Sequence, residues 1–206
     1  MNQLGLIAVT AATVALAGPS LRRRECPEFS AMADFDLEGY TGAWYEIVRD
    51  RATPFEFLAG CVVADYGLSE DGESVSVRNS AHKYHQGWSF VEGEATPAGI
   101  PGTGSLAVHF DGMPQVDEEA NYTVLDTDYE TYSIVYSCGT FYNLLTFDML
   151  WVLAREPYLD AETMDRIEEV IATKLPSYNF ERNAHYTRQG GDCAYEDRFD
   201  ADYYLQ

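Results

Sequence analysis

The feature that most constrains the fold of this 206-residue chain is a series of short runs in which apolar and polar residues alternate. Leu106, Val108 and Phe110, for example, alternate with smaller or polar side chains. A two-residue period places successive side chains on opposite faces of a β-strand. Eight strands are predicted, over residues 43–51, 61–68, 73–84, 86–96, 105–110, 121–126, 129–138 and 147–155.

After the last run, the apolar residues recur at helical spacing instead. Asp160 is suited to cap a helix N-terminus, Ile167 and Leu175 share one helical face, and Pro176 follows. The sequence therefore predicts a helix over about residues 160–175. The order of these elements predicts an all-β fold, an eight-stranded antiparallel up-and-down barrel with one C-terminal α-helix packed outside. About eight strands leave room for one small ligand.

The chain begins with a candidate secretory leader. Residues 4–17 are small or apolar, carry no charge and end in a small-x-small pattern at Ala15-Leu16-Ala17. This run is too short to span a bilayer and is typical of a signal peptide over residues 1–17. Because no Lys or Arg precedes it, an uncleaved N-terminal helix is the alternative. Residues 18–206 would then form a single domain, with the barrel over about 43–155, the helix, and a tail.

The formal net charge of −21 bears on the partners of this chain. A strongly acidic surface repels nucleic acids and anionic membranes. We therefore expect no nucleic-acid partner and no membrane insertion.

The four cysteines are Cys26, Cys61, Cys138 and Cys193. An even number behind a leader favours two disulfides in an oxidising compartment, so the chain is expected to be secreted or otherwise extracytoplasmic. Four cysteines allow three pairings, and spacing alone does not choose among them.

Three short motifs carry a resemblance to a known family. The first is Gly42-Ala43-Trp44 with the strand-like residues after it, the second is Thr127-Asp128-Tyr129, and the third ends a predicted strand at Arg155. In this order and at these separations they resemble the three signature regions of the lipocalins. The resemblance implies that the Arg155 side chain lies over the Trp44 ring at the closed end of the barrel. The predicted floor is Gly42, Trp44, Asp128, Tyr129 and Arg155.

Further motifs resemble the apolipoprotein-D-like lipocalins. They are Cys26-Pro27, Glu92-Gly93-Glu94-Ala95-Thr96-Pro97 and Val135-Tyr136-Ser137-Cys138. This resemblance runs from Cys26 to about Cys193 and implies the disulfides Cys26–Cys138 and Cys61–Cys193. The chain departs from the family in its acidity, in Phe55-Glu56-Phe57 and in the tyrosine-rich tail after Cys193.

A ligand cup is predicted from strand alternation. If Arg155 points inward at Trp44, Leu153 and Trp151 point inward too. Neighbouring strands add their apolar faces, and the family resemblance places Tyr122 inside. The predicted ligand-binding residues are Trp151, Leu153, Phe110, Val108, Leu106, Tyr122, Val124, Val75 and Val77, with Asn79 as a further polar group and Phe55 and Phe57 flanking the entrance. A barrel packed solid by the same residues is the alternative.

These features predict a secreted carrier of a small hydrophobic molecule of the fatty acid, retinoid, steroid or tetrapyrrole class. No enzymatic activity, cofactor or metal is expected. His82 and His85 are three apart, and positions three apart on a strand face opposite sides, which disfavours a shared metal. Asn121 begins an N-glycosylation sequon.

Two alternatives remain open. One is a lipocalin-fold enzyme, either an isomerase using a free cysteine or a carotenoid de-epoxidase type using acidic groups. Among the acids, Asp126 is the one that strand alternation allows inside the barrel, near its closed end. The other is a protein-binding module that uses Phe55, Phe57 and the tyrosine-rich tail.

Overall fold

The computed structural model describes residues 26–51, 53, 56, 58–113, 119–141 and 145–199. The predicted leader, Phe55, Phe57 and the chain after Phe199 lie outside the described residues.

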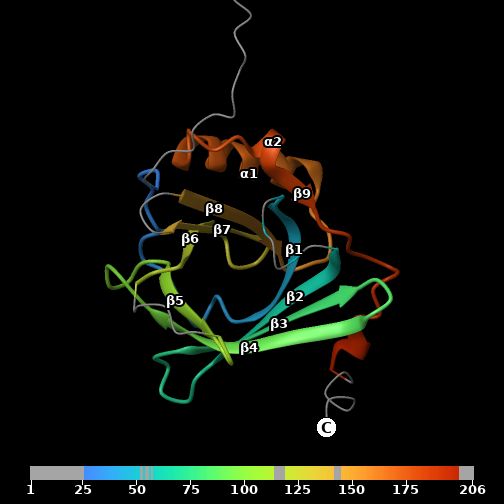
Figure 1. Ribbon diagram of the computed structural model, residues 1–206. Helices are drawn as coiled ribbons and strands as arrows, with labels where there is room; N and C mark the ends of the chain where they lie inside the picture. Colours follow the sequence, from blue (N-terminus) through green and yellow to red (C-terminus); the bar gives the residue numbers. More distant parts are fainter. Residues whose placement is uncertain are drawn as a thin grey trace, which may run out of the picture.

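The eight predicted strands form one closed antiparallel barrel. They are β1 (Gly42–Asp50), β2 (Ala59–Leu68), β3 (Val75–Lys83), β4 (Gly87–Pro97), β5 (Ser105–Phe110), β6 (Tyr122–Thr127), β7 (Tyr132–Phe141) and β8 (Leu145–Ala154). From β2 to β8 each strand pairs with the next in sequence, and β1 pairs with both β2 and β8. The sheet therefore closes on itself, as Figure 1 shows, and the predicted fold class is confirmed.

The predicted helix is α1 (Ala161–Lys174), which lies across the outer wall beside β7 and β8 (Figure 1). The Asp160 side chain caps it by accepting a hydrogen bond from the backbone N–H of Thr163 at 2.8 Å. Ile167, Ile171 and the following Leu175 are buried against the outer faces of the strands. This outer core holds the helix on the barrel and leaves the barrel interior to other residues.

The register shifts between the strands affect which side chains face inward, and those in β1 and β6 bear on the cavity. In β1 the register with β8 shifts between Glu46 and Val48. The side chain of Glu46 faces the barrel interior, as that of Trp44 does, whereas Val48 packs into the outer core under α1. A β-bulge re-aims side chains in this way. As a result Arg49 lies directly opposite Trp151 of β8.

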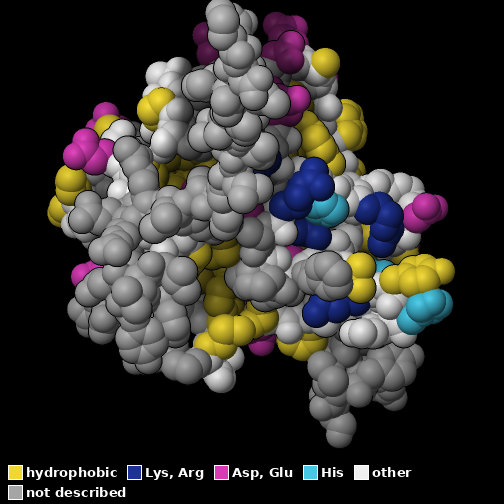
Figure 2. Space-filling view, turned by 45° about the horizontal axis from the view of Figure 1, so that its top comes forward, with side chains coloured by type: hydrophobic (Ala, Val, Ile, Leu, Met, Phe, Trp, Pro, Cys, Tyr) yellow, Lys and Arg dark blue, Asp and Glu magenta, His cyan; other side chains and the backbone are white. Residues whose placement is uncertain are grey.

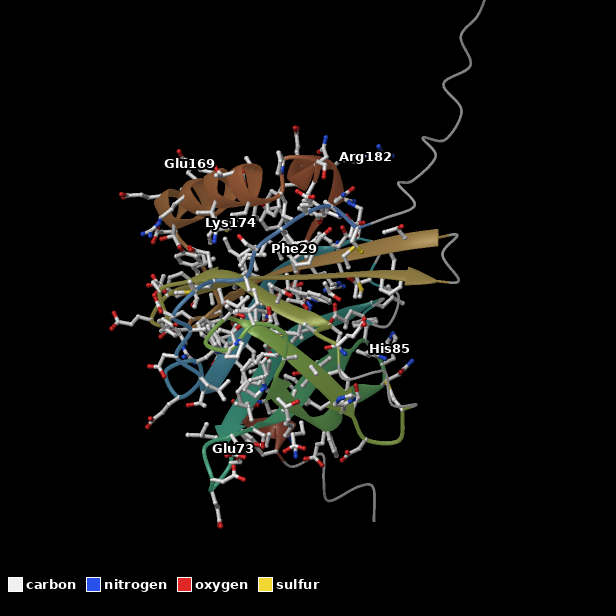
Figure 3. The ribbon with its side chains drawn as sticks, turned by 90° about the vertical axis from the view of Figure 1, so that its left-hand side faces the viewer. Phe29, Glu73, His85, Glu169, Lys174 and Arg182 are labelled. Carbon is white, nitrogen blue, oxygen red and sulfur yellow. A yellow bond between two sulfur atoms is a disulfide. The ribbon has the colours of Figure 1, made fainter. Side chains whose placement is uncertain are left out.

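A second bulge, in β6 between Val124 and Asp126, corrects a prediction. Strand alternation allowed Asp126 inside the barrel, near its closed end, but it lies opposite Ile134 on the outer face. There it accepts a hydrogen bond from the Tyr132 hydroxyl at 2.5 Å. The carbonyl of Leu125, between the two shifted positions, accepts a hydrogen bond from Lys174 of α1 at 2.6 Å. Figure 3 shows Lys174 between the helix and the barrel.

The strand predicted over residues 129–138 begins three residues later, because Asp128 organises a turn there. Its Oδ1 accepts hydrogen bonds from the backbone N–H groups of Glu130, Thr131 and Tyr132 at 3.2, 2.7 and 3.0 Å. Backbone donors occupied in this way are not available to a strand ladder.

Three short elements after α1 were not predicted: α2 (Phe180–Asn183), β9 (Ala184–Tyr186) and the 3₁₀ helix η2 (Tyr195–Arg198). β9 pairs with residues 48–50 of β1, whereas β2 pairs with residues 42–45 of the same strand. In η2, Arg198 forms an ion pair with Asp65 of β2 at 3.1 Å. The C-terminal segment is thus part of the barrel's outer structure.

Two disulfides tie the ends of the described chain to the barrel. Cys26 is bonded to Cys138 of β7, and Cys61 of β2 is bonded to Cys193. This is the pairing that the family resemblance implies. Among the described residues, no helix has both the length and the apolar character needed to cross a membrane.

Candidate ligand-binding site

A cavity of about 830 Å³ lies inside the barrel. At one end its lining includes exposed residues between β5 and β6, such as Met113 and Glu119. At the other end it stops at Tyr40 and Trp44, which are fully buried. The barrel is therefore hollow rather than packed solid, and the volume lies within the ~300–1,000 Å³ typical of small-molecule sites.

Most of the predicted ligand-binding residues lie on the wall of this cavity. They are Trp151, Leu153, Phe110, Val108, Leu106, Tyr122, Val75 and Val77, and Asn79 lies there too. In Figure 2, hydrophobic side chains are visible deep in the hollow between the surrounding segments. Ligand binding by these residues stays a prediction.

Val124 does not line the cavity, contrary to expectation. Its side chain is fully buried in a cluster with Trp44, Val135 and Leu153. This cluster fills the closed end of the barrel, so Val124 supports the floor beneath the cavity. Phe55 and Phe57 lie outside the described residues.

The floor is built by Arg155, whose guanidinium carbon lies 3.7 Å from the centre of the Trp44 ring. The guanidinium also donates hydrogen bonds to the backbone carbonyls of Tyr129, Ala43 and Gly39, at 2.8, 3.1 and 3.0 Å. Gly42 suits this position because its φ is +96°, where other side chains are strained, and because an added Cβ would lie 3.1 Å from Arg155 Nη1 and press on the guanidinium. Arg155 therefore joins the segments that close the barrel.

A chain of hydroxyl groups lies above the floor. The Tyr122 hydroxyl is 3.0 Å from that of Tyr40 and 3.1 Å from that of Tyr66, and Tyr40 continues the chain to Ser133 at 2.8 Å. Burial raises the pKa of Tyr66 to about 12 and the pKa values of Tyr40 and Tyr122 well above their usual value. These hydroxyls therefore stay uncharged at neutral pH.

Two carboxyl groups that were not predicted to line the cavity occupy its wall. Glu46 lies two residues after Trp44 on the same strand face, and Glu56 comes from the loop between β1 and β2. Arg49 donates to Glu46 Oε1 at 2.8 Å, and its Nε lies 3.8 Å from Glu56 Oε2. The Trp151 indole N–H donates to the same Glu56 oxygen at 3.3 Å. The three charged groups thus form one cluster beside Trp151.

This cluster is largely buried, which changes the ionisation of Glu56. Its pKa is raised to about 8, chiefly because burial disfavours the charged form and also because Glu46 lies beside it. Trp151 and Arg49 act in the opposite direction. At neutral pH Glu56 is therefore mostly protonated, a state suited to sharing a proton with Glu46.

The cluster also reaches the C-terminal segment, which no sequence pattern had linked to the cavity. Thr187, after β9, accepts a hydrogen bond from Arg49 Nη1 at 2.8 Å and donates one to Glu46. Gln189 donates to the carbonyls of Glu46 and Val62, both at 2.8 Å. The residues after β9 therefore hold Glu46 in place.

The comparisons with known proteins agree with this architecture. The family model described as a lipocalin-like domain matches residues 35–182. Apolipoprotein D from Bos taurus is 38% identical over 158 residues, which cover 76% of this chain and 79% of that protein. Bilin-binding protein from Pieris brassicae is 31% identical over 147 residues, or 71% of this chain and 75% of that protein.

Among solved structures, insecticyanin from the tobacco hornworm Manduca sexta superimposes with a TM-score of 0.69 at 24% identity, covering 82% of this chain and 88% of that one. At this identity the similarity supports the fold alone. The family model covers most of the chain, and the apolipoprotein D relative supports the same assignment. The chain therefore belongs to the lipocalin family and is similar to apolipoprotein D.

Proposed function

We propose that this protein is a carrier that holds one small hydrophobic molecule inside its barrel. The observation that carries the proposal is the cavity of about 830 Å³, which has an apolar wall and reaches exposed residues at one end. Apolar lining with a few placed polar groups is the usual composition of such sites. Burial of apolar ligand surface supplies the binding energy, at ~25 cal/mol per Å² before the costs of association.

The relatives support a binding role. The name of the Pieris brassicae protein states that it binds a bilin, a ligand of the tetrapyrrole class. The ligand classes proposed here are fatty acids, retinoids, steroids and tetrapyrroles, which are apolar molecules of a size suited to this cavity. Trp151, on the wall, provides an aromatic surface for a flat or elongated molecule.

A secreted or otherwise oxidising location fits this role. All four cysteines take part in the two disulfides, which persist outside the reducing cytosol. We expect the small hydrophobic ligand to be the partner that matters for function, without nucleic-acid binding or membrane insertion.

An enzyme on the same barrel is the second candidate, and one observation favours it. Glu56 and Glu46 are paired acids in a cavity, and the raised pKa of Glu56 is a property that general acids share. The isomerase version requires a free cysteine, whereas both Cys61 and Cys138 are in disulfides. The acid-based version can be tested by recovering the ligand after incubation. A chemically altered ligand supports the enzyme, and an unchanged ligand supports the carrier.

The experiment that tests the carrier proposal is a mass spectrum of the organic extract from protein purified from its own host. We expect one hydrophobic compound in about equimolar amount. Extract from the Phe110→Glu variant, purified in the same way, is the control and should lack that compound. The absence of any compound enriched over the control would contradict the proposal.

A further inference from the structure

The charge distribution on the cavity wall points to the kind of polar group that the ligand carries. This inference rests on the proposed carrier function. Glu46 and Glu56 lie on the wall, and Asp111 and Glu119 lie at the exposed end. None of the described lining residues is a Lys or an Arg. Basic side chains do gather on the surface shown in Figure 2, but they do not belong to the lining.

The guanidinium of Arg49, which lies beside the two carboxyl groups, is committed to protein partners. Nη1 donates to Glu46 and Thr187, both at 2.8 Å. Nη2 donates to the carbonyls of Glu56 and Ala59, at 2.9 and 3.3 Å, and Nε faces the Glu56 carboxyl. Arg49 is only 5% exposed and lies behind the two carboxyl groups. A ligand carboxylate in the cavity would therefore meet carboxyl oxygens instead of the guanidinium.

The remaining polar groups do not replace it. His109 and Glu94 also border the cavity, but they lie opposite each other across β4 and β5, on the face that alternates with the inward-facing Val108 and Phe110. The tyrosine hydroxyls above the floor already bond to one another, as described above. Asn79 Oδ1 is buried on the wall and has no hydrogen-bond partner among the described residues. An unpaired carbonyl acceptor and two carboxyl groups all favour a ligand that donates hydrogen bonds.

We propose that the cavity selects its ligand by charge: it accepts an apolar molecule whose polar end is an uncharged hydroxyl, and it disfavours the corresponding carboxylate. The hydroxyl would donate to the Glu46–Glu56 pair beside the Trp151 ring. A carboxylate of the same skeleton would have to leave water and lie beside two carboxyl groups, with no Lys or Arg on the described wall to compensate its charge. The ligand is thus expected among alcohols of the retinoid or steroid class rather than among fatty acids.

The same cluster adds a pH signature. The charged and titratable groups that face Glu56 are Glu46 and Arg49 of β1, Tyr66 of β2 and, beyond Arg49, His185 of β9. Burial, followed by Arg49, lowers the pKa of His185, so this ring stays uncharged above neutral pH. The pKa of Glu56 is about 8, so its charge appears as the pH rises through that value. A ligand carboxylate is already ionised below it, so discrimination against the carboxylate should increase with pH.

The test compares retinol with retinoic acid, which share one skeleton, by titration of the full-length, disulfide-bonded protein at about pH 6.5 and about pH 9. At the higher pH we expect retinol to bind at least ~10-fold more tightly than retinoic acid. We also expect the ratio of the two Kd values to be at least ~3-fold larger at the higher pH than at the lower one. Because retinol is also the less soluble molecule, this change of ratio with pH is the decisive measurement.

Glu56→Gln is the informative variant, because it keeps the shape of the side chain and removes its titration. The ratio of the two Kd values should then be the same at both pH values. Glu168→Gln, on the exposed face of α1, should behave like the unmodified protein. Equal affinity for retinol and retinoic acid, or an unchanged pH effect in Glu56→Gln, would overturn the charge selection alone. If neither molecule nor any other hydrophobic compound binds, the carrier function itself fails.

Discussion

The guanidinium of Arg155 lies over the indole of Trp44, with its carbon 3.7 Å from the ring centre. Truncation of Trp44 to alanine should lower the free energy of unfolding by ~3–5 kcal/mol, because the Trp44 side chain is fully buried and its removal leaves a cavity. Arg155→Ala should cost ~1–2 kcal/mol from the cation–π contact. Urea denaturation with the disulfides intact measures both. An unchanged midpoint for Arg155→Ala would show that the contact does not stabilise the fold.

The outer core under α1 can be weakened separately from the cavity. Ile171 is 1% exposed and packs with the outward residues of β1 and β8. Ile171→Ala should lower the free energy of unfolding by ~2–5 kcal/mol. Ligand affinity should be unchanged, because Ile171 lies outside the barrel. A large loss of affinity in a variant that remains folded would show that α1 and the cavity are coupled.

Glu56 should make stability depend on pH. Its pKa is about 8 in the folded chain and ~4.3 in an unfolded one, so the folded state binds more protons between these values. The free energy of unfolding should therefore fall as the pH rises from about 4.3 to about 8 and then level off. In Glu56→Gln this contribution should disappear. Urea midpoints across this pH range, compared with those of Glu168→Gln, measure it. If the urea midpoint changed with pH to the same extent in Glu56→Gln and Glu168→Gln, the result would contradict the buried state of Glu56.

The disulfides should be recoverable as two linked peptide pairs after proteolysis without reduction, Cys26 with Cys138 and Cys61 with Cys193. Recovery of a Cys26–Cys61 peptide would be incompatible with the structure. Each bond closes a loop of more than a hundred residues, with sequence separations of 112 and 132. Removing either one should cost up to ~5 kcal/mol in the chain-entropy model.

The sequence was informative wherever alternation was regular. The strand over Ser105–Phe110 was predicted with its observed bounds, and Leu106, Val108 and Phe110 face the cavity as expected. α1 was predicted from its periodicity and its cap at Asp160. These features were predictable because they depend on side-chain spacing within a single element.

Prediction from the sequence failed where a single inserted residue shifts the strand alternation, and where segments distant in the chain meet. The bulge beside Leu125 turned Asp126 outward, and no local pattern signals such an insertion. Glu46 could have been found, since it shares the face of Trp44, but a charged residue was not expected on an apolar wall. Its partner Thr187 is 141 residues away in the chain, and only the folded structure brings the two together.

The most direct test of the carrier function is a fluorescence titration with a panel of fatty acids, retinoids, steroids and tetrapyrroles. At least one compound should bind saturably with a Kd below ~100 μM, which corresponds to roughly −5.5 kcal/mol. It should quench Trp151, so that Trp151→Phe loses most of the signal. Leu153→Glu should abolish binding, and Phe110→Glu, at a less buried position, should do the same in a folded barrel. No saturable binding by any member of the panel, with the barrel intact, would contradict the account.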